Sequence, residues 1–181
     1  MVNFSIEENF LLKTSRLVIS KCQWNRLNST YLNALNDPEV MQYTEARHQK
    51  WDEEKMIKFI DEANQNGSIL FEVKIRDDNK SIGNVRLFNW NKIHCRAELS
   101  FLFYDKSEWG KNYATEAINL ILKFGKEEFN LHRITADYYA CNKASEKLFS
   151  KLGFQIEGVF RDHFWLNDNF IDSIRVGKVY S

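Results

Sequence analysis

Apolar and polar residues alternate along several short stretches of the chain, which is the pattern of half-buried β-strands. The clearest early example is SRLVISKC at 15–22. Later examples are bounded by turn-forming residues such as Asp77-Asp78-Asn79. From this pattern we predict seven strands, at 15–22, 68–76, 81–90, 96–104, 133–140, 154–165 and 170–180.

Other stretches repeat apolar residues at three- and four-residue spacing, as amphipathic helices do. We predict four such helices, at 24–36, 50–64, 111–128 and 143–152. Asn36-Asp37-Pro38 ends the first, and Gly153 ends the last in the position that a left-handed cap favours. The order of strands and helices predicts an α/β fold with a mixed central sheet of about seven strands and about four helices.

Composition limits the class of protein. A length of 181 residues with 44% hydrophobic residues indicates one domain over 1–181. The 25 basic and 25 acidic residues balance, which argues against a nucleic-acid partner. No apolar run approaches the roughly 18 residues of a membrane span, and the N-terminus lacks the apolar core of a secretory signal. We therefore expect no membrane partner.

Cysteine and histidine usage adds two expectations. The three cysteines, Cys22, Cys95 and Cys141, are far apart and form no CxxC pair, which indicates reduced thiols in a cytoplasm. The four histidines have no partner at the four-residue spacing that helical metal ligands use. We expect no metal site.

The segment WGKNYATEA at 109–117 carries the first candidate chemistry, because it places a glycine at the entrance to a predicted helix. Only seven glycines occur in the chain. Backbone amides at a helix N-terminus bind anions, and a glycine lets that backbone approach a phosphate closely. Lys111 could add a point charge. On these residues alone, an ordinary helix start explains the pattern about as well.

Glu98 is a carboxylate within an otherwise apolar predicted strand. It shares a face with Ser100 and Leu102, while Leu99 and Phe101 lie on the other face. One interpretation is a solvent-facing residue on a half-covered sheet. The other is a partly buried carboxylate with a raised pKa, suited to accept a proton. The residues alone do not decide between the two.

Three motifs together resemble the GNAT N-acetyltransferase superfamily, and more narrowly its RimJ/RimL-type branch. They are WGKNYATEA at 109–117, Asn142-Lys143-Ala144-Ser145, and KLGFQIEG at 151–158, in the order and spacing of that branch. LKTSRLVIS at 12–20 resembles its first strand, and NDPEVMQY at 36–43 the exit of its first helix. The resemblance covers about 12–180 and implies a GNAT fold.

The resemblance implies an enzyme that moves an acetyl group from acetyl-CoA to a primary amine by direct attack on the thioester. The amides of the loop would hold the pyrophosphate, which gives Gly110, Lys111, Asn112, Tyr113, Ala114 and Thr115. Leu102 and Phe103 would offer main-chain groups to the pantetheine arm, and Asn142 would hydrogen-bond it. Glu98 is the candidate base, and Ser145 the candidate donor to the leaving sulfur.

Two departures from the family pattern bear on this assignment. The loop of the family begins with Gln or Arg and ends with Gly or Ala, where this chain has Ser107 and Asn112. Asn tolerates a left-handed backbone better than most residues, so the loop can keep its shape. Many members also carry a tyrosine acid where this chain has Phe149. That substitution places more weight on Ser145.

The sequence indicates less about the acceptor than about the donor. TEARHQKW at 44–51 gathers Glu45 and Arg47 between two helices, either as a solvated loop or as part of the acceptor site. Similar segments occur in GNAT proteins that acetylate nucleotide-linked amino sugars, which makes an amino sugar the first expectation. Arg47 would then pair with a phosphate, and Asp172 would also line the site.

Other functions stay open. A protein N-terminus and a polyamine are alternative acceptors. A polyamine requires an acidic cleft, which Glu45 and other acidic residues could supply. A CoA-binding module without catalysis is a third possibility, kept open by Asn112 and Phe149. The edge-forming strands at 154–180 make a homodimer possible.

Overall fold

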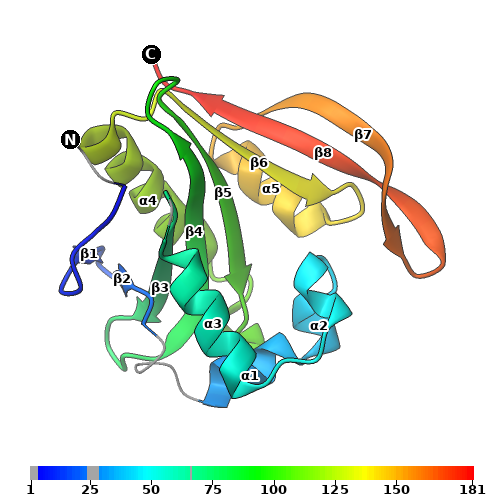
Figure 1. Ribbon diagram of the computed structural model, residues 1–181, viewed down its shortest axis with the longest axis horizontal. Helices are drawn as coiled ribbons and strands as arrows, with labels where there is room; N and C mark the ends of the chain where they lie inside the picture. Colours follow the sequence, from blue (N-terminus) through cyan, green and yellow to red (C-terminus); the bar gives the residue numbers. More distant parts are fainter. Residues whose placement is uncertain (1–3, 24–28, 66) are drawn as a thin grey trace.

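One sheet of eight strands, in the order β1-β2-β3-β4-β5-β6-β8-β7, organises the chain (Figure 1). In this computed structural model the described residues are 4–23, 29–65 and 67–181. The strands are β1 (Leu11–Lys13), β2 (Leu17–Lys21), β3 (Ile69–Ile75), β4 (Ser81–Asn91), β5 (Arg96–Phe103), β6 (Arg133–Tyr139), β7 (Gln155–Leu166) and β8 (Asn169–Val179).

Five α-helices and two short 3₁₀ helices are present among the described residues. They are α1 (Ser29–Leu35), α2 (Pro38–Met41), η2 (Glu45–His48), α3 (Glu53–Ala63), η3 (Lys106–Glu108), α4 (Tyr113–Phe129) and α5 (Lys143–Lys151). Several begin where the sequence provides a cap: the Asp52 side chain accepts from the Lys55 amide at the start of α3, for example. Gly153, at φ +79°, follows the end of α5.

The strands pair antiparallel except at one junction, β5 with β6, which is parallel. That pairing covers Arg96–Glu98 opposite Arg133–Thr135. Beyond Glu98 the two strands diverge, and Figure 1 shows them separating toward the α2 end. The main-chain groups of 99–103 on this edge therefore face an opening instead of a neighbouring strand. This opening positions the site.

Two apolar cores cover the opposite faces of the sheet. Alternating residues of β3 divide between them, with Phe71 in the larger core and Leu70 in the smaller one. The larger core packs α4 and α5 against the sheet through residues such as Ile118, Ile121 and Phe149. The smaller core packs α1, α2 and α3 on the other face. The opening between β5 and β6 connects the two faces.

The sequence prediction of an α/β fold with a mixed sheet is confirmed, and all seven predicted strands are present. Four small elements were missed: β1, α2 and the two 3₁₀ helices η2 and η3. Each is three or four residues long, so none is long enough to display a hydrophobic period. Of the predicted helix at 24–36, positions 24–28 lie outside the described residues, and α1 occupies Ser29–Leu35.

Candidate active site

A cavity of about 800 Å³ fills the opening between β5 and β6. One wall is the unpaired edge of β5, and the facing wall is the end of β6. The start of α4 and the inner side of α5 close one end of the cavity. The segment from α2 to η2 and Phe164 of β7 close the other. Residues far apart in the sequence therefore meet in one cavity.

The backbone at the start of α4 has the conformation that an anion cradle needs. Gly110 has φ +78° and Asn112 has φ +65°, both left-handed. No side chain caps α4, so the first-turn amides have no such partner, and Tyr113, Ala114 and Thr115 line the cavity. A Cβ built on Gly110 would meet no atom within 4 Å, so glycine is needed for its φ and not to avoid a clash.

The lysines near this loop differ from the expectation. Lys111 does not line the cavity, because its ammonium pairs with Glu108 at 2.8 Å. Lys147 and Lys151 of α5 line it instead, and the Lys151 ammonium donates to the Asn112 side-chain oxygen at 2.8 Å. The sequence signal for this pair is their i, i+4 spacing on α5, which places both on one face.

Leu102 and Phe103 line the cavity from the unpaired edge of β5. The Phe103 carbonyl already accepts a hydrogen bond from the Trp109 indole, at 2.8 Å. Opposite them, Gly83 of β4 pairs with Phe103, and a Cβ there would lie 2.6 Å from the Phe103 ring. This glycine allows the strand carrying the cavity edge to approach β4 closely.

Asn142 and Ser145 meet at the start of α5, and both line the cavity. The Asn142 side-chain oxygen accepts from the Ser145 amide at 3.1 Å, so Asn142 is the N-cap of the helix. The three-residue spacing of N-x-x-S therefore has a structural reason independent of any ligand. Ser145 is buried at 8% exposure. Phe149, on the same helix, also lines the cavity and carries no hydroxyl group.

Glu98 is not among the residues that line the cavity. It lies at the closed end of the opening, where Asn89 donates to it at 3.1 Å and the Arg175 guanidinium lies 3.6 Å away. Arg175 also donates to Asp137, at 2.8 Å from Nε. Asp137 does line the cavity. Glu98 therefore reaches the cavity only through Arg175 and Asp137, or through water, and its role as a base stays a prediction.

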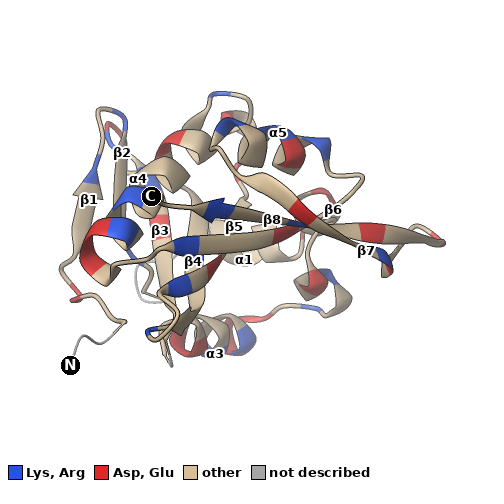
Figure 2. Ribbon diagram, turned by 90° about the horizontal axis from the view of Figure 1, so that it is seen from above, with Lys and Arg blue, Asp and Glu red and all other residues tan. Residues whose placement is uncertain are grey.

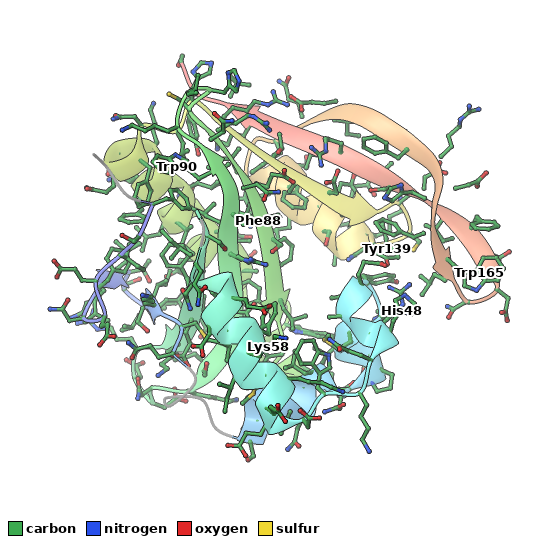
Figure 3. The ribbon with its side chains drawn as sticks, viewed as in Figure 1. His48, Lys58, Phe88, Trp90, Tyr139 and Trp165 are labelled. Carbon is green, nitrogen blue, oxygen red and sulfur yellow. The ribbon has the colours of Figure 1, made fainter. Side chains whose placement is uncertain are left out.

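Arg47 does not line the cavity, whereas Glu45 does. The Arg47 guanidinium donates to the Thr44 carbonyl at 2.7 Å, to the Trp165 carbonyl at 2.8 Å, and to the Tyr139 hydroxyl. Its side chain is 15% exposed. Figure 3 shows Tyr139 at the end of β6, facing the segment that carries His48. The Arg47 guanidinium thus links the start of η2 to β6 and β7. The expected contact between Arg47 and a substrate phosphate is not supported.

Asp172 also lies away from the cavity lining. Its carboxylate accepts from the Asp162 amide at 2.9 Å, and its carbonyl accepts from the Ala140 amide at the same distance. Asp162 sits in an irregular part of β7, between Phe160 and Phe164, with φ +50°. Asp172 stabilises this bend, which brings Phe164 toward β6.

Asp137, Tyr139 and Phe164 are among the lining residues that were not singled out as site residues from the sequence. The Tyr139 and Phe164 rings stack with centroids 3.8 Å apart, and the Tyr139 hydroxyl donates to Glu45. Strand parity is a signal for two of them, since Asp137 and Tyr139 share the face opposite Tyr138. Phe164 had no such signal, because the bend in β7 interrupts the alternation.

Burial and neighbours perturb the tyrosines of the cavity. Desolvation, together with the hydrogen bond to Glu45, raises the pKa of Tyr139 to about 12, against a smaller opposing effect of Arg47. Desolvation also raises the pKa of Tyr138. Both phenols are therefore protonated at neutral pH and act as hydrogen-bond donors.

The residues present fit acetyl-CoA. Left-handed backbone and uncapped amides at the start of α4, with Lys147 and Lys151 close by, suit the phosphates. The unpaired edge of β5 suits an extended arm with amide groups, which can bind as an added strand does. Within the ranges that the structure describes, no group of three His, Cys, Asp or Glu side chains is placed to hold a metal, and no helix is long and apolar enough to cross a membrane.

Comparison with known proteins adds the family. Residues 16–155 match the family described as an acetyltransferase (GNAT) domain. The N-acetyltransferase YoaA of Bacillus subtilis is 31% identical over 113 residues, covering 62% of this chain and 61% of that protein. The spermidine N(1)-acetyltransferase of Escherichia coli K12 is 31% identical over 102 residues, covering 55% of this chain and 53% of that enzyme. Both matches span less than two thirds of the relative.

Solved structures share the fold over a longer range. The spermidine N-acetyltransferase of Vibrio cholerae, in complex with CoA and spermine, superimposes with a TM-score of 0.81. It is 24% identical, and the match covers 92% of this chain and 96% of that one. At this identity the likeness shows the arrangement of helices and strands.

Proposed function

We propose that the chain, which belongs to the GNAT acetyltransferase family, is an acyltransferase that uses acetyl-CoA, and that its acceptor is a cationic primary amine of the polyamine class. The observation that carries this proposal is the set of acidic and aromatic residues in the cavity lining. Glu39, Glu45 and Asp137 line the cavity together with Tyr139 and Phe164. Carboxylates and ring faces both attract an ammonium group.

The cations that balance these carboxylates do not line the cavity. Arg175 contacts Asp137, Arg47 lies 3.4 Å from Glu45, and Lys106 lies 2.9 Å from Glu39. The lysines that do line the cavity, Lys147 and Lys151, lie on α5. A protonated amine is favoured by this arrangement, and a phosphate group is disfavoured.

The amino-sugar expectation depended on Arg47 as a phosphate ligand. With its donors bound to protein groups, Arg47 gives that acceptor little support. A peptide N-terminus, which the resemblance to the RimJ/RimL-type branch would favour, is the second candidate. It also presents a cationic amine, so the same carboxylates would attract it. The relative that acts on spermidine supports the polyamine as the first candidate.

The chain's contribution to the reaction begins with orientation. Acetyl-CoA supplies an activated thioester when bound. The amides at the start of α4, the edge of β5 and Asn142 at the N-terminus of α5 would hold acetyl-CoA. Glu45, Asp137 and the rings of Tyr139 and Phe164 would hold the amine on the other side. Bringing the two reactants together in a fixed geometry is a large share of what such a site can contribute.

Proton transfer is the remaining demand. An alkyl amine with a pKa of about 10 must lose a proton before it can attack. We assign the acceptance of this proton to the Asp137 carboxylate or, through water, to Glu98, while Arg175 keeps its own proton and orients both carboxylates. Ser145, buried in the wall, is the hydroxyl we assign to the leaving sulfur. Phe149 offers no alternative there, and Tyr138 is the other protonated hydroxyl on this wall.

A homodimer is also part of the proposal. Of the nine large apolar side chains that are exposed among the described residues, six lie on β7 and β8. β7 is the edge strand of the sheet, and Figure 2 shows the hairpin projecting beyond the rest of the molecule. A second copy of the chain would cover these side chains. A cytoplasmic location is likewise proposed, supported by the three free cysteines.

The test is release of free thiol from acetyl-CoA by the purified protein with a panel of amines. The panel holds spermidine, spermine, peptides with alanyl or seryl N-termini, and a nucleotide-linked amino sugar. The largest kcat/KM with the polyamines supports the proposal, and the largest with the peptides supports the second candidate. Turnover of the amino sugar alone overturns the assignment of a cationic acceptor. Tight CoA binding with no turnover points instead to a module without catalysis.

A further inference from the structure

Thr14 and Arg16, in the turn between β1 and β2, bind a residue about one hundred positions away. The Thr14 hydroxyl donates to the Glu116 carboxylate, and Arg16 donates to the same carboxylate from Nε at 2.7 Å and from a terminal nitrogen. Glu116 lies in the first turns of α4, directly after the cavity-lining residues 113–115. Three charge-assisted hydrogen bonds therefore join the turn between β1 and β2 to α4, the helix whose first amides would bind the phosphates.

Arg16 also contacts the loop itself. Its other terminal nitrogen donates to the Lys111 carbonyl at 3.2 Å, and its guanidinium carbon lies 4.5 Å from the centre of the Tyr113 ring. The carbonyl and the amide of one planar trans peptide point in opposite directions. Holding the Lys111 carbonyl on the outside thus fixes the direction of the Asn112 amide, which belongs to the same peptide group.

The turn that carries these side chains is fixed to the sheet. The Thr14 hydroxyl accepts from the Leu17 amide at 2.8 Å, and the Arg76 amide donates to the Arg16 carbonyl at 2.8 Å. Because the Thr14 oxygen accepts from the backbone, its hydrogen is directed to Glu116. Backbone hydrogen bonds therefore hold Thr14 and Arg16 in place independently of their contacts with α4.

Charge gives the cluster a second role. Glu116 is a carboxylate close to the end of α4 where the phosphates of the donor would bind, and an unpaired carboxylate would repel them. Partial burial alone would raise the pKa of Glu116, but the hydrogen bonds from Thr14 and Arg16 hold it below its ordinary value. The carboxylate is ionised, and Arg16 compensates its charge.

We propose that Thr14, Arg16 and Glu116 form a clamp that positions the 110–113 loop for the phosphates of the donor and so sets the affinity for coenzyme A. The three are positioning residues, since none of them lines the cavity. The clamp concerns the donor alone. Its binding test needs no acceptor, so the clamp stands or fails separately from the proposed polyamine.

The experiment measures coenzyme A binding by titration calorimetry in Arg16→Gln, Arg16→Lys and Glu116→Gln. The matched control is Arg76→Gln, which removes an exposed arginine from the neighbouring turn between β3 and β4. We expect Arg16→Gln to raise the Kd for coenzyme A roughly tenfold. Arg16→Lys should lie between it and the native chain, because an ammonium cannot reproduce the fork of the guanidinium. Arg76→Gln should leave the Kd unchanged.

Two further measurements make the proposal falsifiable. In Arg16→Gln the KM for acetyl-CoA should rise with the Kd, while kcat at saturating donor stays near the native value. The double variant Arg16→Gln/Glu116→Gln should bind coenzyme A at least as well as Arg16→Gln, because it removes the uncompensated carboxylate. An unchanged Kd in Arg16→Gln and Glu116→Gln, with lowered melting temperatures, would make the cluster a structural contact only and overturn the proposal.

Discussion

The Tyr139 hydroxyl donates to the Glu45 carboxylate and so joins the end of β6 to η2, across 94 positions of the chain. The Tyr139 ring meanwhile stacks on Phe164, which brings β7 into the same wall. Three segments that no local pattern relates therefore form one side of the cavity. The proposed acceptor site depends on this wall, and several predictions concern it.

Arg47→Ala should raise the KM for the acceptor and leave the KM for acetyl-CoA near its native value. Arg47 donates to Thr44, Tyr139 and Trp165. Its loss therefore removes the hydrogen bonds between η2, β6 and β7, and it leaves the start of α4 unchanged. Hydrogen bonds from charged groups contribute about 1.5–3 kcal/mol each. The melting temperature should fall as well. Lys58→Ala, on the exposed side of α3, is the control, and equal increases in both KM values would contradict this role.

Asp137→Asn should weaken the binding of an acceptor with several positive charges more than that of an acceptor with one. The carboxylate lines the cavity, and the amide keeps its size without its charge. The expected result is a raised KM for spermidine, measured beside an amine that carries a single charge. A similar increase for both amines would show that Asp137 acts through packing with Arg175 and not through its charge.

Glu98→Gln tests proton transfer. If Glu98 accepts the amine proton through water, the variant should lower kcat most at low pH, where few amine molecules are neutral. The measurement is the pH–rate profile of the variant against the native chain, with Asp137→Asn alongside. A profile of unchanged shape in Glu98→Gln removes the residue as a base.

Gly110→Ala should affect binding more than folding. Alanine at φ +78° costs about 1–2 kcal/mol in a regular left-handed backbone. Nothing lies within 4 Å of the added Cβ, so the exposed loop can change its conformation without disturbing the core. We expect a small change in melting temperature and a marked rise in the Kd for coenzyme A. A large loss of stability with unchanged binding would contradict the proposed role of this loop.

Asp105 should make stability depend on acid pH. Burial would raise its pKa, but hydrogen bonds from Lys80 and Ser107 hold the pKa below its ordinary value of 3.8. A carboxyl group with a lowered pKa stabilises the fold at pH above its ordinary value, and this contribution is lost as the pH falls through the folded-state pKa. Asp105→Asn should therefore flatten the decline of melting temperature below about pH 4. An identical decline in both chains would contradict this.

The β7–β8 hairpin should control self-association. Trp165 and Phe170 are 51% and 62% exposed, and their rings contact each other near the tip of the hairpin. Replacing both by serine should shift a dimer to a monomer in sedimentation equilibrium, with the melting temperature of the monomer little changed. A native chain that is monomeric at all concentrations measured would remove the homodimer.

The residues proposed for the donor half of the site could largely be predicted to lie together, because their motifs are local. Gly110, Asn142 and Ser145 lie in short motifs whose spacing has a direct structural reason, such as the N-cap of α5. The residues of the acceptor half could not, since Tyr139, Asp137 and Phe164 meet only through the divergence of β5 and β6 and the bend in β7. Arg47 shows the difference most clearly: its charge is evident in the sequence, but its three protein acceptors are not.

The divergence of β5 from β6 leaves the sheet incomplete at its centre. A sheet margin is usually a liability, because its unpaired groups recruit other chains. Here residues of α4, α5 and the α2–η2 segment line the cavity beside this margin. An extended arm bound along 99–103 would act as a temporary extra strand and complete the hydrogen-bonded ladder. The melting temperature should therefore rise with the concentration of coenzyme A, so that the stability of the folded protein depends on how much donor is available.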